Sequence, residues 1–140
     1  MPTPTRFLHN EIVVHVPSEA TGERFTLVEC TGPAGDQPPL HVHHADDETF
    51  YVLAGRMRFW LAGGTCVEAG PGECVLAPRG IPHTYRVESP EGARWLVACA
   101  PGGFDRFVTS AGADPTPGEL TALAAEIGVE ILGPPGALPS

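Results

Sequence analysis

The sequence predicts an all-β fold, a barrel or a two-sheet sandwich, followed by a short C-terminal helix. Three observations support this: short apolar or alternating runs recur over residues 10–100, Gly and Pro separate them, and a helical pattern appears only after Pro101. Short strands at regular spacing between turn residues are typical of barrels and sandwiches. At 140 residues the chain suits one domain, 1–140, with a barrel core at about 10–100 and a helical extension at about 101–132.

Nine strands are predicted in chain order, each from an apolar run or an alternation of apolar and polar residues. They cover Glu11–Val16, Arg24–Cys30, Leu40–His44, Glu48–Ala54, Met57–Leu61, Thr65–Glu68, Glu73–Ala77, His83–Val87 and Arg94–Ala100. Turn sequences rich in Gly and Pro separate many of them, at 32–35, 54–55, 63–64, 70–72 and 78–80. Both ends of the chain, 1–5 and 133–140, are rich in Pro and are expected to be loose.

A helix is predicted to follow Thr116. Thr116 suits the N-cap, Pro117 suits the first helical position, and Glu119 at the third completes a capping box. Apolar residues then recur at helical spacing, and Gly128 is a suitable stop. This face, which we expect to pack against the barrel or to cover a subunit interface, consists of Leu120, Leu123, Ala124 and Ile127. A shorter helical turn before it has an apolar face of Phe104, Phe107 and Val108.

The charge of the chain excludes several kinds of partner. The formal net charge is −9, which argues against nucleic acid and anionic membrane surfaces, since both bind through basic groups. All eight basic residues are Arg, and the absence of Lys excludes Schiff-base chemistry and a phosphate-binding P-loop lysine. We therefore expect neither nucleic acid nor a membrane surface as a partner.

The cysteines and the N-terminus favour a cytoplasmic location. The first residues show no basic head followed by an apolar stretch, and no apolar run approaches the roughly 18 residues of a membrane span. The four cysteines are widely spaced and form no C-x-x-C pair, so we expect reduced thiols. They are Cys30, Cys66, Cys74 and Cys99.

The residues with chemical potential concentrate in one segment that carries His41, His43 and Glu48. In a strand, residues i and i+2 face the same side, so His41 and His43 project together while His44 faces away. Unbroken strand geometry would place Glu48 opposite His43, but the polar residues 45–47 are predicted to form a turn that returns it to the same cavity. Two imidazoles and a carboxylate on neighbouring strands are good ligands for Mn, Fe, Co, Ni, Cu or Zn.

His83 is the fourth candidate ligand, because the stiff turn at 78–82 delivers the next strand at a fixed angle. His9 and His15 lack such a context and are interpreted as structural or surface residues. The sequence therefore predicts one divalent transition-metal ion, of undetermined identity, on His41, His43, Glu48 and His83.

With these histidines and Glu48 at these spacings, the sequence resembles the cupin family. The first cupin motif, G-x5-H-x-H-x3-4-E-x6-G, is matched at every spacing by Gly35, His41, His43, Glu48 and Gly55. The second, G-x5-P-x-G-x2-H-x3-N, is matched by Gly72, Pro78, Gly80 and His83. Only its last position departs, because Val87 stands where Asn is expected, which indicates an apolar wall there.

The resemblance implies a double-stranded β-helix of two antiparallel sheets, assigns the family's metal ligands to the four residues above, and favours a homodimer. Within the family, the segment 47–57 and the tail 101–107 with its capped helix are similar to short bacterial members related to quercetin dioxygenases. That similarity implies O2-dependent oxidation of a flavonol-like or other enol substrate.

Strand alternation predicts which side chains face the pocket, and among them those that could transfer a proton. Residues on the same side as Glu48 and His83 form an apolar, aromatic lining that suits a flat, hydrophobic or phenolic small molecule. The predicted substrate-contacting residues are Phe50, Phe59, Tyr85 and Val87. Glu48 is expected to serve as ligand and as the base that accepts a substrate proton, and Tyr85 as a second catalytic residue.

Three functions are compatible with this site. The first is a metal-dependent dioxygenase of quercetinase type. The second is a non-redox isomerase, cyclase or lyase that acts on a polyketide or sugar-like compound, in which the metal polarises a carbonyl. The third is a module that binds a small ligand without turnover.

Overall fold

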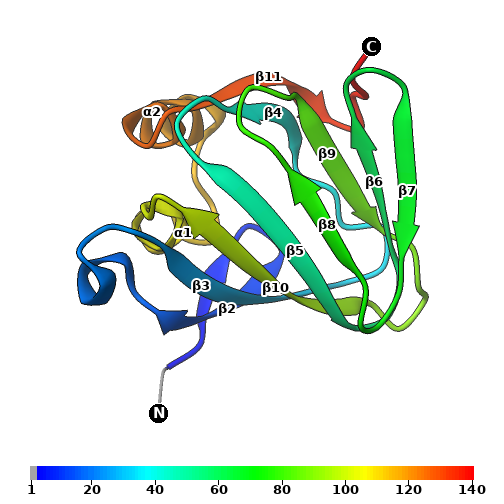
Figure 1. Cartoon of the computed structure of the whole chain (residues 1–140), viewed down its shortest axis with the longest axis horizontal. Coiled ribbons are helices and arrows are strands. Elements are labelled where there is room, and N and C mark those ends of the chain that lie inside the picture. Colours follow the sequence, from blue (N-terminus) through cyan, green and yellow to red (C-terminus); the bar gives the residue numbers. More distant parts are fainter. Residues whose placement is uncertain (1–2) are drawn as a thin grey trace.

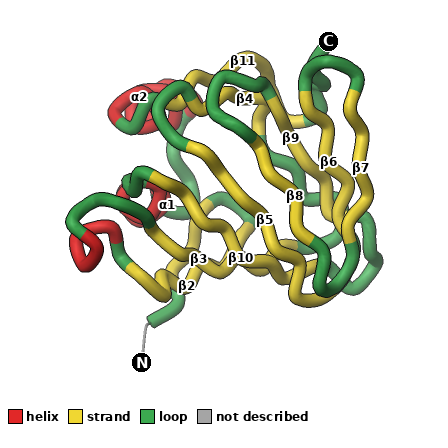
Figure 2. The backbone as a smooth tube through the Cα atoms, viewed as in Figure 1, coloured by secondary structure: helices red, strands yellow, loops and turns green. Residues whose placement is uncertain are grey.

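Two antiparallel sheets face each other in the computed structural model, which describes residues 3–140 (Figures 1 and 2). The first sheet contains, in spatial order, β1 (Thr5–Phe7), β2 (Asn10–Val16), β3 (Thr26–Gly32), β10 (Ala93–Ala100), β5 (Asp47–Ala54) and β8 (Cys74–Ala77). The second contains β11 (Val129–Pro135), β4 (Pro39–His43), β9 (His83–Val87), β6 (Met57–Leu61) and β7 (Thr65–Ala69). This is the predicted double-stranded β-helix.

All nine predicted strands are present; Met57–Leu61 and His83–Val87 have the predicted bounds, and the others differ by at most two residues at either end. Three further elements were not predicted: β1, β11 and a short 3-10 helix, η1 (Ser18–Thr21). The expectation that 133–140 is loose is wrong for its first residues, because β11 continues to Pro135. Pairing with β4, in which Val129 lies opposite His43 and Ile131 opposite His41, supplies order that the Pro-rich sequence does not reveal.

The N-terminal expectation also needs correction. Thr5 is ordered in β1 and lies opposite Ile12 of β2. Residues 1–2, which were expected to be loose as well, lie outside the described part of the chain. The edges of the two sheets on one side of the molecule are therefore β1 and β11, both formed by the ends of the chain.

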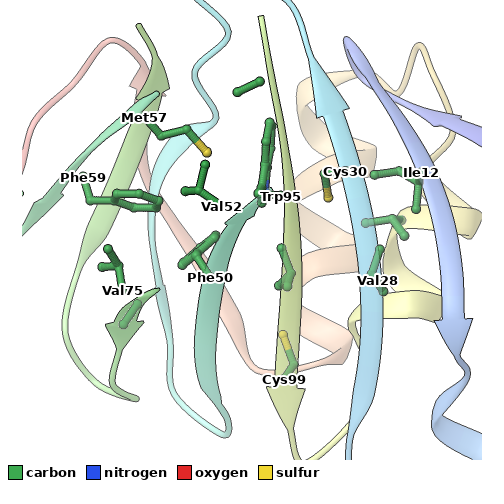
Figure 3. Close-up of a cluster of buried hydrophobic side chains, with 14 of the residues drawn as sticks. Ile12, Val28, Cys30, Phe50, Val52, Met57, Phe59, Val75, Trp95 and Cys99 are labelled. Carbon is green, nitrogen blue, oxygen red and sulfur yellow. The ribbon is translucent and has the colours of Figure 1, made fainter. Parts of the chain in front are cut away.

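The core lies between the sheets and follows the alternation of the strands (Figure 3). On β5 the buried side chains are Phe50 and Val52, and on β10 Trp95 is fully buried. Met57 and Phe59 face inward from β6, while Arg58 and Trp60 alternate outward. Burial of these side chains at about 25 cal/mol per Å² is the main force that holds the sheets together.

Two helices follow β10, α1 (Phe104–Ala111) and α2 (Pro117–Glu126), and both lie at the same end of the barrel (Figure 1). The predicted capping box is present: Thr116 accepts a hydrogen bond from the backbone N–H of Glu119, and Glu119 accepts one from that of Thr116. Gly128 follows the helix with φ of 77°. Within the described residues, neither helix has the length and apolarity that crossing a membrane requires.

A buried polar contact fixes α1 against η1, the short helix between β2 and β3 of the first sheet. Asp105 accepts hydrogen bonds from the backbone N–H of Ser18 at 2.9 Å and from its hydroxyl at 2.5 Å. The hydroxyl oxygen of Ser18 in turn accepts a hydrogen bond from the N–H of Gly103 at 2.8 Å. The chain after β10 is thereby held against η1.

Candidate metal centre

The structure brings His41, His43, Glu48 and His83 together in the space between the two sheets. One ligand atom from each lies within 4.8 Å of all the others. Oε1 of Glu48 lies 3.2 Å from Nε2 of His43 and 3.0 Å from Nε2 of His83. Three of the four side chains are buried, and His41 is half-buried.

The cluster combines residues from both sheets. His41 and His43 project from β4, and His83 projects from β9 directly opposite His41 in the strand register. Glu48 belongs to β5 in the other sheet. A bend at residues 44–45 carries the chain from one sheet to the other, so Glu48 approaches the histidines from across the barrel.

Each histidine has one ring nitrogen engaged away from the centre. Nδ1 of His41 lies 2.7 Å from the carbonyl oxygen of Pro39, and Nδ1 of His83 lies 3.2 Å from that of Ile81. Nδ1 of His43 lies 3.0 Å from the carboxylate of Asp46. Such outward acceptors hold the proton on Nδ1, fix the ring orientation and leave the Nε2 lone pair available for a metal.

The donor set fits a divalent transition metal. Donors at about 2.1 Å from one ion and at right angles to each other lie about 3 Å apart, which matches the separations of Glu48 from His43 and His83. Three imidazoles and one carboxylate are ligands typical of Mn, Fe, Co, Ni, Cu and Zn. The residues present could therefore hold one such ion and leave positions open on an ion that takes five or six ligands.

The electrostatics couple the four side chains. Burial by itself would lower the pKa of His43, but Glu48 and Asp46 raise it to about 10. Burial would likewise raise the pKa of Glu48, yet His43 and His83 hold it well below its usual value. Burial and the two neighbouring histidines lower the pKa of His41 to about 3. Without a metal, the cluster therefore contains an ionised Glu48 and a charged His43 beside a neutral His41.

A small cavity of about 60 Å³ adjoins the cluster and is called here the inner cavity. His41, His43 and Glu48 line it together with the predicted Phe50 and Tyr85. The structure places the other two predicted wall residues, Phe59 and Val87, in the core with 1% exposure each. Val87 shares the inward face of β9 with the cavity residue Tyr85, whereas no residue of β6, the strand of Phe59, lines the cavity.

Several wall residues were missed by the sequence reading, because they come from the ends of the chain. These are, among others, Phe7, Leu8 and Asn10 near β1, Leu120 on α2, and Val129 and Ile131 on β11. The sequence predicts the apolar face of α2 but assigns it to packing against the barrel or to a subunit interface, and not to a pocket wall. Asp46, the carboxylate behind His43, was likewise treated as a turn residue; its position three residues after His43 was the only available signal.

A larger groove of about 430 Å³, called here the vestibule, adjoins the inner cavity. Phe7, Asn10, Tyr85 and Leu120 line both spaces. Since β1 and β11 also contribute to both, access lies between these two edge strands and beside α2.

The remaining histidines lie outside the cluster. His44 points outward, as predicted from strand alternation, and its Nε2 lies 2.9 Å from Oε1 of Glu130. His15 is exposed and pairs with Glu29. His9 is exposed at the edge of the vestibule. Within the described residues, all four cysteines are free; Cys30 and Cys99 are buried, whereas Cys66 and Cys74 are exposed.

Comparison of the sequence with models of protein families shows the family to which the chain belongs. The model of the cupin domain matches residues 28–99, which contain all four residues of the cluster. The chain is a cupin. The double-stranded β-helix is thus the fold of this family, and the His/Glu cluster lies within the matched segment.

Two curated relatives of this cupin are quercetin 2,3-dioxygenases. That of Bacillus subtilis (strain 168) is 33% identical over 100 residues, which are 71% of this chain and 29% of the relative. That of Aspergillus japonicus is 26% identical over 97 residues, 65% of this chain and 27% of the relative. The cupin thus spans less than a third of the length of either enzyme.

Among solved structures, the polyketide cyclase RemF from Streptomyces resistomycificus is similar to this cupin, with a TM-score of 0.60 and 27% identity. The similarity covers 71% of this chain and 73% of RemF. The cupin therefore has relatives named for an oxidation and for a cyclisation, and the family alone does not choose between them.

Proposed function

We propose that this cupin is a metal-dependent enzyme that oxidises a hydrophobic phenolic or enol-type small molecule with O2, in the manner of a quercetin 2,3-dioxygenase. The observation that carries the proposal is the position of the His41, His43, Glu48 and His83 cluster at the wall of an apolar cavity. The similarity to two quercetin 2,3-dioxygenases supports the choice of reaction. A divalent transition metal on these four residues would supply Lewis-acid chemistry and, where the ion is redox-active, electron transfer.

Glu48 is the residue proposed to accept a proton. Its carboxylate is buried, and the histidines around it favour its ionised form. An enol or phenol hydroxyl that enters the inner cavity meets this carboxylate as the nearest acceptor. Transfer of the proton to Glu48 generates an electron-rich enolate or phenolate, the form of the substrate that is easiest to oxidise.

Tyr85 is proposed to orient the substrate. Burial, together with the negative charge of Asp36, raises the pKa of Tyr85 well above its usual value, so the hydroxyl stays protonated and donates. The residue lines both the inner cavity and the vestibule. A substrate oxygen at the junction of the two spaces can accept this hydrogen bond, while Phe50 and neighbouring apolar side chains exclude water from the ring.

Oxygen uptake by the metal-analysed protein with a panel of phenols and enols tests this proposal. We expect O2 consumption with at least one compound, and its loss in His83→Ala. Oxygen uptake that persists in His83→Ala at full rate would contradict the assignment of the site. Turnover at the same rate under strict anaerobiosis would exclude the dioxygenase reaction.

A non-redox reaction is the second candidate, favoured by the similarity to the polyketide cyclase RemF. The same residues serve it: a carbonyl polarised in the inner cavity would lose a neighbouring proton to Glu48, and Tyr85 would donate to the developing oxygen charge. Anaerobic turnover supports this candidate. Tight ligand binding without any turnover would leave a binding module.

A further inference from the structure

The vestibule carries a second group of polar side chains that the proposed reaction does not use. Asn10, Asp36 and Gln37 line it, at the end of the first β-hairpin and in the segment that precedes β4. Most of the remaining wall is proline and aliphatic surface, including Pro38, Pro117 and Ile131. A few polar groups in an otherwise apolar groove are typical of the positions that orient a ligand.

The polar atoms of this group are only partly satisfied by the protein. Nδ2 of Asn10 donates to Oδ2 of Asp36 at 2.6 Å, and within the described chain Oδ1 of Asp36 accepts no side-chain hydrogen bond. Nε2 of Gln37 is buried and has no partner in residues 3–140. Burial raises the pKa of Asp36, although the hydrogen bond from Asn10 opposes that effect. A buried donor without a partner costs free energy, which a ligand atom would recover.

The backbone around Asp36 is rigid. Its N–H donates to the carbonyl of Pro33 at 3.1 Å, and its carbonyl accepts from the N–H of Val87 at 2.9 Å. The N–H of Gly35 donates to the carbonyl of Val87 at 2.9 Å. The backbone of Asp36 is therefore held beside the end of β9, whose other end carries His83, and the hydrogen bond from Asn10 holds its carboxylate. A fixed acceptor binds a ligand group with little loss of entropy.

The volumes require a substrate that reaches beyond the inner cavity. About 60 Å³ beside the cluster accommodates only a small group, whereas the vestibule offers about 430 Å³. A ring compound whose reactive oxygens lie at Glu48 must therefore extend past Tyr85 into the vestibule. Its far end then meets Asp36 and Gln37.

We propose that Asp36 and Gln37 form a specificity site for a hydroxyl group on the far end of an elongated aromatic substrate. The hydroxyl donates to Oδ1 of Asp36 and accepts from Nε2 of Gln37, which is buried in the wall and must turn towards the vestibule to make this contact. A hydroxyl fits this pair because it is both donor and acceptor, whereas an ammonium group would offer only donors and would be repelled by the Gln37 amide hydrogens. The inference deepens the proposed function and rests on it for the position of the reactive end.

The test uses two elongated phenols that present the same hydroxyl to Glu48 and differ only at the far end: biphenyl-4,4′-diol, which has a second hydroxyl there, and 4-hydroxybiphenyl, which has none. Binding to the metal-loaded protein is measured by ligand-observed NMR for wild type, Asp36→Asn and Gln37→Met. Glu130→Gln is the matched control, since it makes the same change of carboxylate to amide on an exposed residue outside both spaces.

We expect biphenyl-4,4′-diol to bind wild type and Glu130→Gln equally, and to lose about tenfold in affinity in Asp36→Asn, as for one hydrogen bond to a charged group. Gln37→Met, which keeps the length of the side chain, should lose several-fold. 4-Hydroxybiphenyl should bind more weakly than biphenyl-4,4′-diol, and its affinity should be the same in wild type, Asp36→Asn and Gln37→Met.

Equal affinity of wild type for the two compounds would overturn the specificity site, as would equal losses for both compounds in Asp36→Asn. Oxygen uptake is measured separately on the same samples. Discrimination between the two compounds without any oxygen uptake would retain the site and reject the proposed reaction. Oxygen uptake without discrimination between the two compounds would retain the proposed reaction and reject the specificity site.

Discussion

Nε2 of His83 lies 3.0 Å from Oε1 of Glu48, although the two residues stand 35 positions apart and belong to different sheets. The contact crosses the interior of the barrel and joins β9, which carries His83, to β5, which carries Glu48. This distance matches the separation expected between neighbouring donor atoms of one metal ion. The candidate metal centre therefore also bridges the two sheets.

Replacement of His41 or His83, which lie opposite each other on β4 and β9, should lower the metal content of the centre. We expect His41→Ala and His83→Ala to lower the bound metal several-fold, because each removes one of three imidazoles. Elemental analysis of untagged protein gives the metal-to-protein ratio. His44→Ala is the matched control, since that ring faces outward to Glu130. Full occupancy in both substituted proteins would refute the assignment.

The carboxylate behind His43 should matter almost as much as a ligand. Asp46→Asn weakens the acceptor that orients Nδ1 of His43, and loss of such partners typically lowers metal affinity 10- to 100-fold. Competition with a chromophoric chelator measures this affinity. The adjacent Asp47→Asn is the control, because Asp47 is half exposed and pairs with Arg79. Equal effects of the two substitutions would show that Asp46 acts through general charge and not through His43.

Phe59 should contribute to stability and not to ligand specificity. It is 1% exposed and packs against Phe50 at 5.0 Å between ring centroids, outside the cavity wall. Phe59→Leu is expected to lower the free energy of unfolding by about 1–2 kcal/mol. Urea denaturation measures the loss, and KM for any substrate found should stay within twofold. A large change in KM with unchanged stability would place Phe59 at the cavity after all.

The contact between Asp105 and Ser18 should give a pH-dependent contribution to stability. Burial opposes ionisation of Asp105, but the hydrogen bonds from Ser18 lower its pKa below the usual value. The contribution is therefore complete above a pH of about 4 and is lost as the pH falls through the lowered pKa. We expect Asp105→Asn to reduce stability by about 1–2 kcal/mol at neutral pH, a difference that shrinks under acid conditions.

Thermal unfolding of wild type and Asp105→Asn from pH 7 down to pH 3.5 measures that difference. Glu23→Gln serves as control, because Glu23 is an exposed partner of Arg106 and such pairs contribute little. A stability difference that stays constant over the whole pH range would mean that Asp105 does not act through its charge.

The sequence by itself determined the nine central strands, the capped helix and the four residues of the His/Glu cluster. These features depend on local rules: the alternation in β4 places His41 and His43 on one side, Gly and Pro define the approach to His83, and Thr116 with Glu119 starts α2. Fixed motif spacings then led to the family, because a ligand set is carried by residue identity and distance along the chain.

The tertiary structure alone decided which inward residues border the cavity. Phe50 and Phe59 satisfy the same alternation, yet only Phe50 reaches the space, since coverage depends on neighbours from other strands. The ordering of β1 and β11 likewise depends on pairing with distant strands, and it brings both ends of the chain to the wall of the pocket. Strand alternation gives the side of a sheet on which a residue lies, whereas long-range packing decides what covers that side.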